Sequence, residues 1–273
     1  MKIRFAMIGA RGIDHGAFAE LKGLLAHAGL DAEPAFVPTY AAMYGLLQQR
    51  VCTLGWSPPL VARDLLRDHQ AEPVALVLRN GTQSYYSAIV TKTSSWLWHV
   101  GQLERARIGW VSRLSAAGYV VPRAYLATRR VSLSFARETF HETHARAAAA
   151  LEKDTVDAVA TYAIVRDAKT LHVPLVPDFN VLAAAGPIPG ELVVAPSGTD
   201  SSLVLAARDA LSHEAPDPNG RLASLGVTGF APPPEHYVDV LSQWDGRGVP
   251  FTAAWQHPHW LGGDRMAFAH DCG

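Results

Sequence analysis

The sequence has little cysteine. Its 273 residues include two, Cys52 and Cys272, which lie far apart in the chain. Cys52 falls in an apolar, strand-like pattern and Cys272 lies next to the C-terminus. We therefore expect a small buried residue and a terminal thiol, because a disulfide framework or a cysteine metal site needs more cysteines at shorter spacings.

The chain also has little charge imbalance. Lysine and arginine number 24 and aspartate and glutamate 25, which gives a formal net charge of -1. This balance argues against a generally basic surface for nucleic acid and against a polybasic membrane anchor, although it leaves room for a local patch. No nucleic-acid partner is expected. The 49% hydrophobic content is enough for a substantial core.

Long hydrophobic runs are missing as well. No stretch of 18 or more apolar residues occurs, so no transmembrane segment is expected. The apolar stretch at residues 3–9 is short and contains Arg4, which does not fit the core of a signal peptide. We expect it to be the first strand. As written, the chain is expected in the cytoplasm, and in the periplasm or outside the cell if a leader was removed.

Two common cofactor and metal motifs are absent. Gly9, Gly12 and Gly16 give the spacing G-x-x-G-x-x-x-G, which departs from the G-x-G-x-x-G of dinucleotide sites even though Asp31 follows at a plausible distance. Residues 141–144 read His-Glu-Thr-His, one residue short of the zinc motif H-E-x-x-H. No cofactor and no metal are predicted.

What is present is an alternation of apolar strands and amphipathic helices. A Gly-rich turn leads from the first strand into a helix, and loops are predicted at residues 214–218 and 231–234. Strands are predicted at residues 3–9, 34–37, 51–55, 74–79, 84–91, 107–111, 156–161 and 191–194, and helices at 39–50, 144–153, 199–211 and 234–244. The pattern predicts an α/β protein.

Four short segments resemble a known family. They are the run at residues 79–87, which reads RNGTQSYYS, the turn at 115–122, which reads SAAGYVVP, the helix start Thr143-His144, and Pro187-Ile188-Pro189. In this order they resemble the PhnD-like phosphate/phosphonate substrate-binding proteins of ABC transporters. The resemblance implies the two-lobed type 2 periplasmic-binding-protein fold, with residues 1–82 and 188–273 in the first lobe and 83–187 in the second. It also implies a hinge at the two crossing segments and an ABC transporter permease as a possible partner.

The resemblance further implies a ligand site between the lobes. Its candidates are Trp56, Ser57, Tyr85, Tyr86, Ser87, Ser115, His144 and Asp157. Alternatives exist for several of them: Trp56 as a packing residue, Ser115 as a helix cap and Asp157 as a turn residue. Tyr85 and Tyr86 are neighbours on a strand, so at most one of them can face the ligand. Asp178 and Asn180, placed in a loop, are weaker candidates.

One departure from the family pattern bears on the ligand. The turn that usually reads Ser-Thr-Ser-Gly, and whose hydroxyls bind phosphate or phosphonate, reads Ser-Ala-Ala-Gly at residues 115–118. The sequence therefore favours a binding module for a small anionic or polar metabolite of the phosphonate/phosphate class. The alternative is a cytoplasmic enzyme on the same fold, since a fold does not fix a function. No catalytic residue is assigned.

The C-terminal tail holds Trp255, Trp260 and several histidines, among them the His257-x-His259 pair. This spacing matches no strong metal template, so a packed aromatic tail is favoured.

Overall fold

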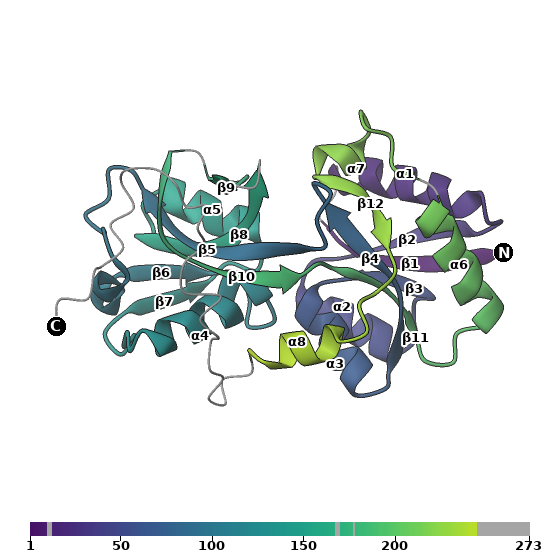
Figure 1. Cartoon of the computed structure of the whole chain (residues 1–273), viewed down its shortest axis with the longest axis horizontal. Coiled ribbons are helices and arrows are strands. Elements are labelled where there is room, and N and C mark those ends of the chain that lie inside the picture. Colours follow the sequence, from purple (N-terminus) through teal and green to yellow (C-terminus); the bar gives the residue numbers. More distant parts are fainter. Residues whose placement is uncertain (10–12, 167–169, 177, 214, 245–273) are drawn as a thin grey trace. The chain divides into compact units, whose positions relative to one another are not determined.

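The computed structural model describes residues 1–9, 13–166, 170–176, 178–213 and 215–244, so the predictions for the tail lie outside the described residues. The chain divides into two compact units. Unit 1 comprises Met1–Ser84 and Pro189–Ser242, and unit 2 comprises Tyr85–Ile188 with the described residues Gln243 and Trp244. Each unit has its own sheet (Figure 1). The α/β class is confirmed.

Unit 1 is a mixed sheet covered by helices. Its six strands follow the order β12-β4-β11-β3-β1-β2, with β1 parallel to β2 and β3, and β11 antiparallel to β3 and β4. In chain order its elements are β1 (Lys2–Ile8), α1 (Ile13–Ala26), β2 (Asp31–Val37), α2 (Tyr40–Gln48), β3 (Leu54–Ser57), α3 (Pro59–Arg67), β4 (Ala71–Arg79), β11 (Leu192–Pro196), α6 (Ser201–His213), α7 (Arg221–Ser224), β12 (Val227–Ala231) and α8 (Tyr237–Ser242).

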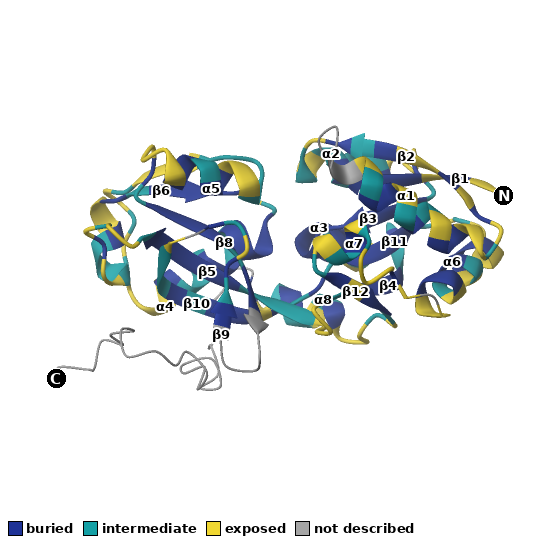
Figure 2. Ribbon diagram, turned by 90° about the horizontal axis from the view of Figure 1, so that it is seen from above, coloured by how far each residue is buried: buried dark blue, intermediate teal, exposed yellow. Residues whose placement is uncertain are grey.

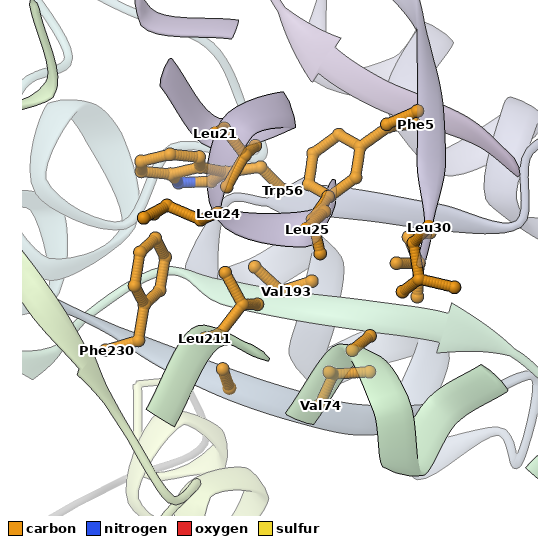
Figure 3. Packing of buried hydrophobic residues seen from close by; sticks show 14 of the residues in the cluster. Phe5, Leu21, Leu24, Leu25, Leu30, Trp56, Val74, Val193, Leu211 and Phe230 are labelled. Carbon is orange, nitrogen blue, oxygen red and sulfur yellow. The ribbon is translucent and has the colours of Figure 1, made fainter. Parts of the chain in front are cut away.

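The core of unit 1 lies between the sheet and helices α1, α6 and α7. Leu21 and Leu25 of α1, Leu211 of α6 and Leu222 of α7 are buried there against residues of the strands. Figure 3 shows Trp56 and Phe230 beside the leucines of α1 in this cluster. Most of the strand residues in both units are buried (Figure 2), as a sheet covered by helices requires.

The strands that leave unit 1 are fixed by polar contacts. Arg79, the last residue of β4, donates hydrogen bonds from Nε and Nη2 to the Glu191 carboxylate at 3.0 and 2.8 Å. The buried Tyr237 hydroxyl of α8 donates to the Gly190 carbonyl at 2.8 Å. These contacts hold residues 79 and 190–191 within unit 1. The prediction that the two crossing segments act as a hinge stays a prediction.

Unit 2 has a five-stranded path, β10-β5-β8-β6-β7, with β9 paired to β8. Its elements are β5 (Ser84–Lys92), the 3₁₀ helix η1 (Val100–Arg105), β6 (Arg107–Trp110), one turn of π-helix η2 (Ala116–Val120), α4 (Val121–Thr128), β7 (Arg137–Phe140), α5 (His144–Glu152), β8 (Ala158–Arg166), β9 (Thr170–His172) and β10 (Phe179–Pro189). Strands β8, β6 and β7 run parallel, and β5 runs antiparallel to β8.

Several sequence predictions need correction. Residues 51–53, which we included in the strand, precede it, and Trp56 and Ser57, which we left outside the strand, end β3 directly before the next helix, α3. That helix begins at Pro59, because proline suits the first helical position. Asn180 lies in strand β10 and not in a loop. The last helix covers only Tyr237–Ser242.

Strand β10 was not predicted, and four short elements were missed as well. They are α7, β7, β9 and β12, each of three to five residues. Such elements carry too few residues for an amphipathic period, and tertiary pairing decides them.

Candidate functional site

The carboxyl ends of the parallel strands in unit 2 bring several predicted residues together. The turn containing Ser115 follows β6, and Thr143 and His144 follow β7, its parallel neighbour. Strand β8 pairs with β6 through Ile108 and Gly109 only, so Thr161 of β8 extends beyond the end of β6. In open α/β sheets ligands bind outside the carboxyl ends of parallel strands, where helix N-termini gather.

Ser115 is the N-cap that starts η2. Its Oγ accepts a hydrogen bond from the Gly118 backbone N–H at 3.0 Å, and the residue is 2% exposed. The predicted cap is confirmed. Gly118 is required here because a Cβ would lie 2.4 Å from the Val111 side chain. The neighbouring Ala116 and Ala117 are buried too, so the turn is tightly packed and presents few hydroxyl donors.

His144 begins helix α5, whose N-cap is Thr143, as predicted. Its Nδ1 lies 3.0 Å from Thr161 Oγ1, within hydrogen-bond distance. The His144 ring also packs edge-on against Tyr162, with ring centroids 5.2 Å apart. These two contacts from β8 fix the orientation of the imidazole at a helix N-terminus, where the backbone dipole favours negative charge.

Ser87 joins this region from β5. It is buried and donates a hydrogen bond from Oγ to the Ala117 carbonyl at 2.8 Å, and it pairs across the sheet with Tyr162. Ser87 therefore ties the strand to the η2 turn. The structure thus brings Ser87, Ser115 and His144 into one region of unit 2.

Tyr85 and Tyr86 are both partly buried. Tyr86 packs over the backbone of Gly186, where a Cβ would lie 2.6 Å from its ring. Burial raises the pKa of Tyr86, so its phenol stays protonated and able to donate. Which of the two tyrosines meets a ligand stays a prediction.

Asp157 lies directly before the first residue of β8, whereas Thr161 and Tyr162 lie near the middle of that strand. It accepts hydrogen bonds from the Arg107 backbone N–H at 2.8 Å and from the Arg107 guanidinium at 2.6 Å. Burial opposes ionisation of Asp157, but the hydrogen bonds and charge of Arg107 outweigh it and hold its pKa below the ordinary value. This position supports the start of β6 and is separate from the region around His144.

Replacing Asp157 with asparagine should lower the free energy of unfolding by about 1–2 kcal/mol at pH 7. A charged hydrogen-bonded pair is worth about 1.5–3 kcal/mol, discounted here because Arg107 is half exposed. Because the folded pKa is depressed, this stability is present above the unfolded value and is lost as the pH falls through the folded pKa. Urea unfolding from pH 7 to pH 3 should show the difference between wild type and Asp157→Asn shrinking. Asp154→Asn, which breaks the exposed pair with Lys92, is the control and should change little; a constant difference across this pH range would contradict the account.

Trp56 and Ser57 belong to unit 1. Trp56 is 6% exposed and packs edge-on against Phe230, with centroids 6.1 Å apart. Ser57 is fully buried at the end of β3. Both have the surroundings of core residues, and their proposed contact with a ligand remains a prediction.

The region around His144 contains groups of the kind that bind anions in other proteins. It offers an imidazole, the hydroxyls of Ser115 and Thr161 and two helix starts, η2 and α5. Among the described residues no group of three or more His, Cys, Asp and Glu side chains is placed to hold a metal ion. Thr161 was not among the predicted site residues. In the sequence, Thr161 is a hydroxyl residue near the middle of an apolar strand. That pattern alone does not distinguish a ligand-binding residue from an ordinary strand residue.

Comparison with known proteins gives the class and the family of this chain. Residues 19–237 match the family described as ABC transporter, phosphonate, periplasmic substrate-binding protein. The chain belongs to this family, which confirms the resemblance. A comparison with curated proteins found no match.

Solved structures agree on the fold. The binding protein component of an ABC phosphonate transporter from Pseudomonas aeruginosa is 17% identical, with a TM-score of 0.73 over 89% of this chain and 85% of that one. PhnD1 from Prochlorococcus marinus in complex with methylphosphonate is 12% identical, with a TM-score of 0.72 over 88% and 96%. XAC2383 from Xanthomonas citri is 17% identical, with a TM-score of 0.70 over 89% and 95%. The periplasmic-binding-protein fold is thereby confirmed.

The helices of the described residues include none with the length and apolar content needed to cross a membrane. The family is periplasmic, and membership implies a small-molecule ligand and a permease partner.

Proposed function

We propose that this protein binds a small phosphonate-class anion and presents it to an ABC transporter permease. The observation that carries the proposal is the meeting of His144, Ser115 and Ser87 at the carboxyl ends of β6 and β7 in a chain of this family. The similar PhnD1 was solved in complex with methylphosphonate, which makes methylphosphonate the first ligand to test. The comparisons give the enzymatic alternative no support.

The anion is proposed to meet the start of η2 and the imidazole of His144. Helix starts bind anions through backbone N–H groups and the helix dipole, and a positioned imidazole adds a directed donor. Trp56, Ser57 and one of the two neighbours Tyr85 and Tyr86 are proposed to contact the rest of the ligand. Export to the periplasm is part of the proposal, as the family implies.

Removing the imidazole tests this site. His144→Ala should weaken methylphosphonate binding by about 1–2 kcal/mol, or about five- to thirtyfold, because one hydrogen bond to a charged group is lost. Titration calorimetry measures the change. His213→Ala, which alters an exposed histidine of unit 1, is the matched control and should bind as the wild type does.

Two results would contradict the proposal. One is wild-type protein that binds no phosphonate of a short alkyl series. The other is mass spectrometry showing the ligand converted by wild type and not by His144→Ala, since the proposed module leaves its ligand chemically unaltered. A His144→Ala variant with unchanged affinity would remove His144 from the site.

A further inference from the structure

The end of the unit 2 sheet opposite the candidate site carries exposed aromatic side chains. Trp96 is 54% exposed, Trp98 67% and Phe135 78%. They lie on two loops, residues 93–99 after β5 and 131–136 before β7. Strands β6 and β7 begin in register at Arg107 and Arg137, and β5 ends where its partner β8 begins, so both loops leave this same end. No function described above uses these three residues.

The aromatic side chains are held out of the core by ordered loops. Leu97, between the two tryptophans, is fully buried in a cluster that also receives Leu133 and Ala136 from the second loop. The Gln102 side chain fixes the first loop: it accepts hydrogen bonds from the backbone N–H groups of Trp98 and His99 and donates to the Trp96 carbonyl at 3.2 Å. Buried residues therefore anchor both loops to the core of unit 2, while the side chains of Trp96, Trp98 and Phe135 face solvent.

The same end of the sheet is rich in arginine. Arg105 ends η1, Arg129 and Arg130 follow α4, and Arg137 opens β7, where its N–H donates to the Ala106 carbonyl at 2.9 Å. All four are exposed, and none forms an ion pair with another described residue. Carboxylates of this region are partly engaged already, Asp154 by Lys92 and Asp157 by Arg107. Arg129 lies over the Tyr125 ring, 5.5 Å from its centroid, and the exposed Glu104 precedes Arg105. The face therefore combines exposed aromatics with arginines that form no ion pair with a described residue, and it retains a net positive charge.

From this combination we infer that the aromatic–basic face, defined as Trp96, Trp98 and Phe135 with Arg105, Arg129, Arg130 and Arg137, docks on an anionic lipid surface. Tryptophan is the residue that gathers at membrane interfaces, where its apolar ring and polar N–H are both satisfied. Arginine beside it adds attraction to anionic headgroups, worth about 1 kcal/mol for each arginine near the surface. An anionic bilayer supplies both a counter-charge for the arginines and an interface for the aromatic rings.

The face lies at the opposite end of β6 and β7 from the region around His144. Docking there would leave the proposed ligand site uncovered. The inference does not depend on the proposed function, and ligand affinity provides an independent readout.

Vesicle flotation tests the inference. The full-length protein should float with vesicles of phosphatidylglycerol and phosphatidylcholine and stay unbound with phosphatidylcholine alone, and raising the salt from 0.05 to about 0.5 M should release it. Trp96→Ala with Trp98→Ala should lower the partition coefficient about tenfold or more. Each of Arg129→Gln, Arg130→Gln and Arg137→Gln should lower it about fivefold.

Leu205→Ser is the matched control, because Leu205 is 60% exposed on α6 of unit 1 and lies outside the face. It should float as the wild type does, and all variants should keep wild-type affinity for methylphosphonate. Wild-type protein that fails to float, that floats equally with neutral vesicles, or whose flotation survives the double tryptophan change would overturn the inference. So would light scattering that shows a dimer lost in that double variant, because the face would then be a contact between two copies of this chain.

Discussion

Titration calorimetry should show that inorganic phosphate binds this protein no more tightly than the micromolar range. The turn that supplies hydroxyls in the family has Ala116 and Ala117 in their place. The remaining hydroxyl, of Ser115, already accepts the Gly118 N–H and has only its own proton to donate. Each missing charge-assisted hydrogen bond is worth roughly 1.5–3 kcal/mol, so two can lower the affinity by about two orders of magnitude or more.

Restoring the hydroxyls gives the reciprocal experiment. The double variant Ala116→Ser with Ala117→Ser should tighten phosphate binding by about a hundredfold, by the same arithmetic. Both alanines are buried, so thermal unfolding must show that the variant is folded. Ala127→Ser, an exposed change near the end of α4, is the control for adding a hydroxyl elsewhere. Sub-micromolar phosphate binding by the wild type would contradict the prediction.

Replacing Trp56 with alanine should lower the free energy of unfolding by about 3–5 kcal/mol. Trp56 is 6% exposed in the core of unit 1, where its ring meets Phe230 (Figure 3). Removing a large aromatic side chain from a packed core loses its transfer free energy and leaves a cavity. Urea unfolding followed by circular dichroism measures the loss. Trp98→Ala, which removes an exposed indole, should change stability by less than about 0.5 kcal/mol.

The milder change Trp56→Phe separates packing from ligand contact. Phenylalanine keeps most of the apolar volume, so the variant should fold. If Trp56 meets the ligand as proposed, methylphosphonate affinity should still fall. Unchanged affinity in a folded Trp56→Phe protein would leave Trp56 as a core residue alone, and a wild-type stability for Trp56→Ala would contradict its packing role.

The helix caps show what local sequence can predict. Thr39, Ser115 and Thr143 were read as helix starts, and each accepts a backbone N–H from the following turn in the structure. Their signal is local, since a hydroxyl before a helical pattern satisfies donors a few residues away. Long periodic segments such as α6 were predicted for the same reason.

The surroundings of the site residues could not be predicted in this way. Thr161 lies 17 residues from His144, and no pattern in the sequence links them until α5 and β8 pack. Asp157 illustrates the same limit: its bonds to Arg107 span 50 residues and place it directly before β8, apart from the proposed anion site. Trp56 was a candidate through the family resemblance, with packing as its alternative, and the structure places it among the core residues.

The sequence by itself determined the α/β class, most of the strands and helices, the caps and, through four short segments, the family. These follow from short-range hydrogen bonding and from the period of apolar residues, which a linear sequence contains. The tertiary structure alone decided which of these residues meet at one edge of a sheet, and which side chains of the loops stay exposed. The pairing register between strands that are distant in the chain determines both of these features. That register depends on tertiary packing, which no local segment specifies.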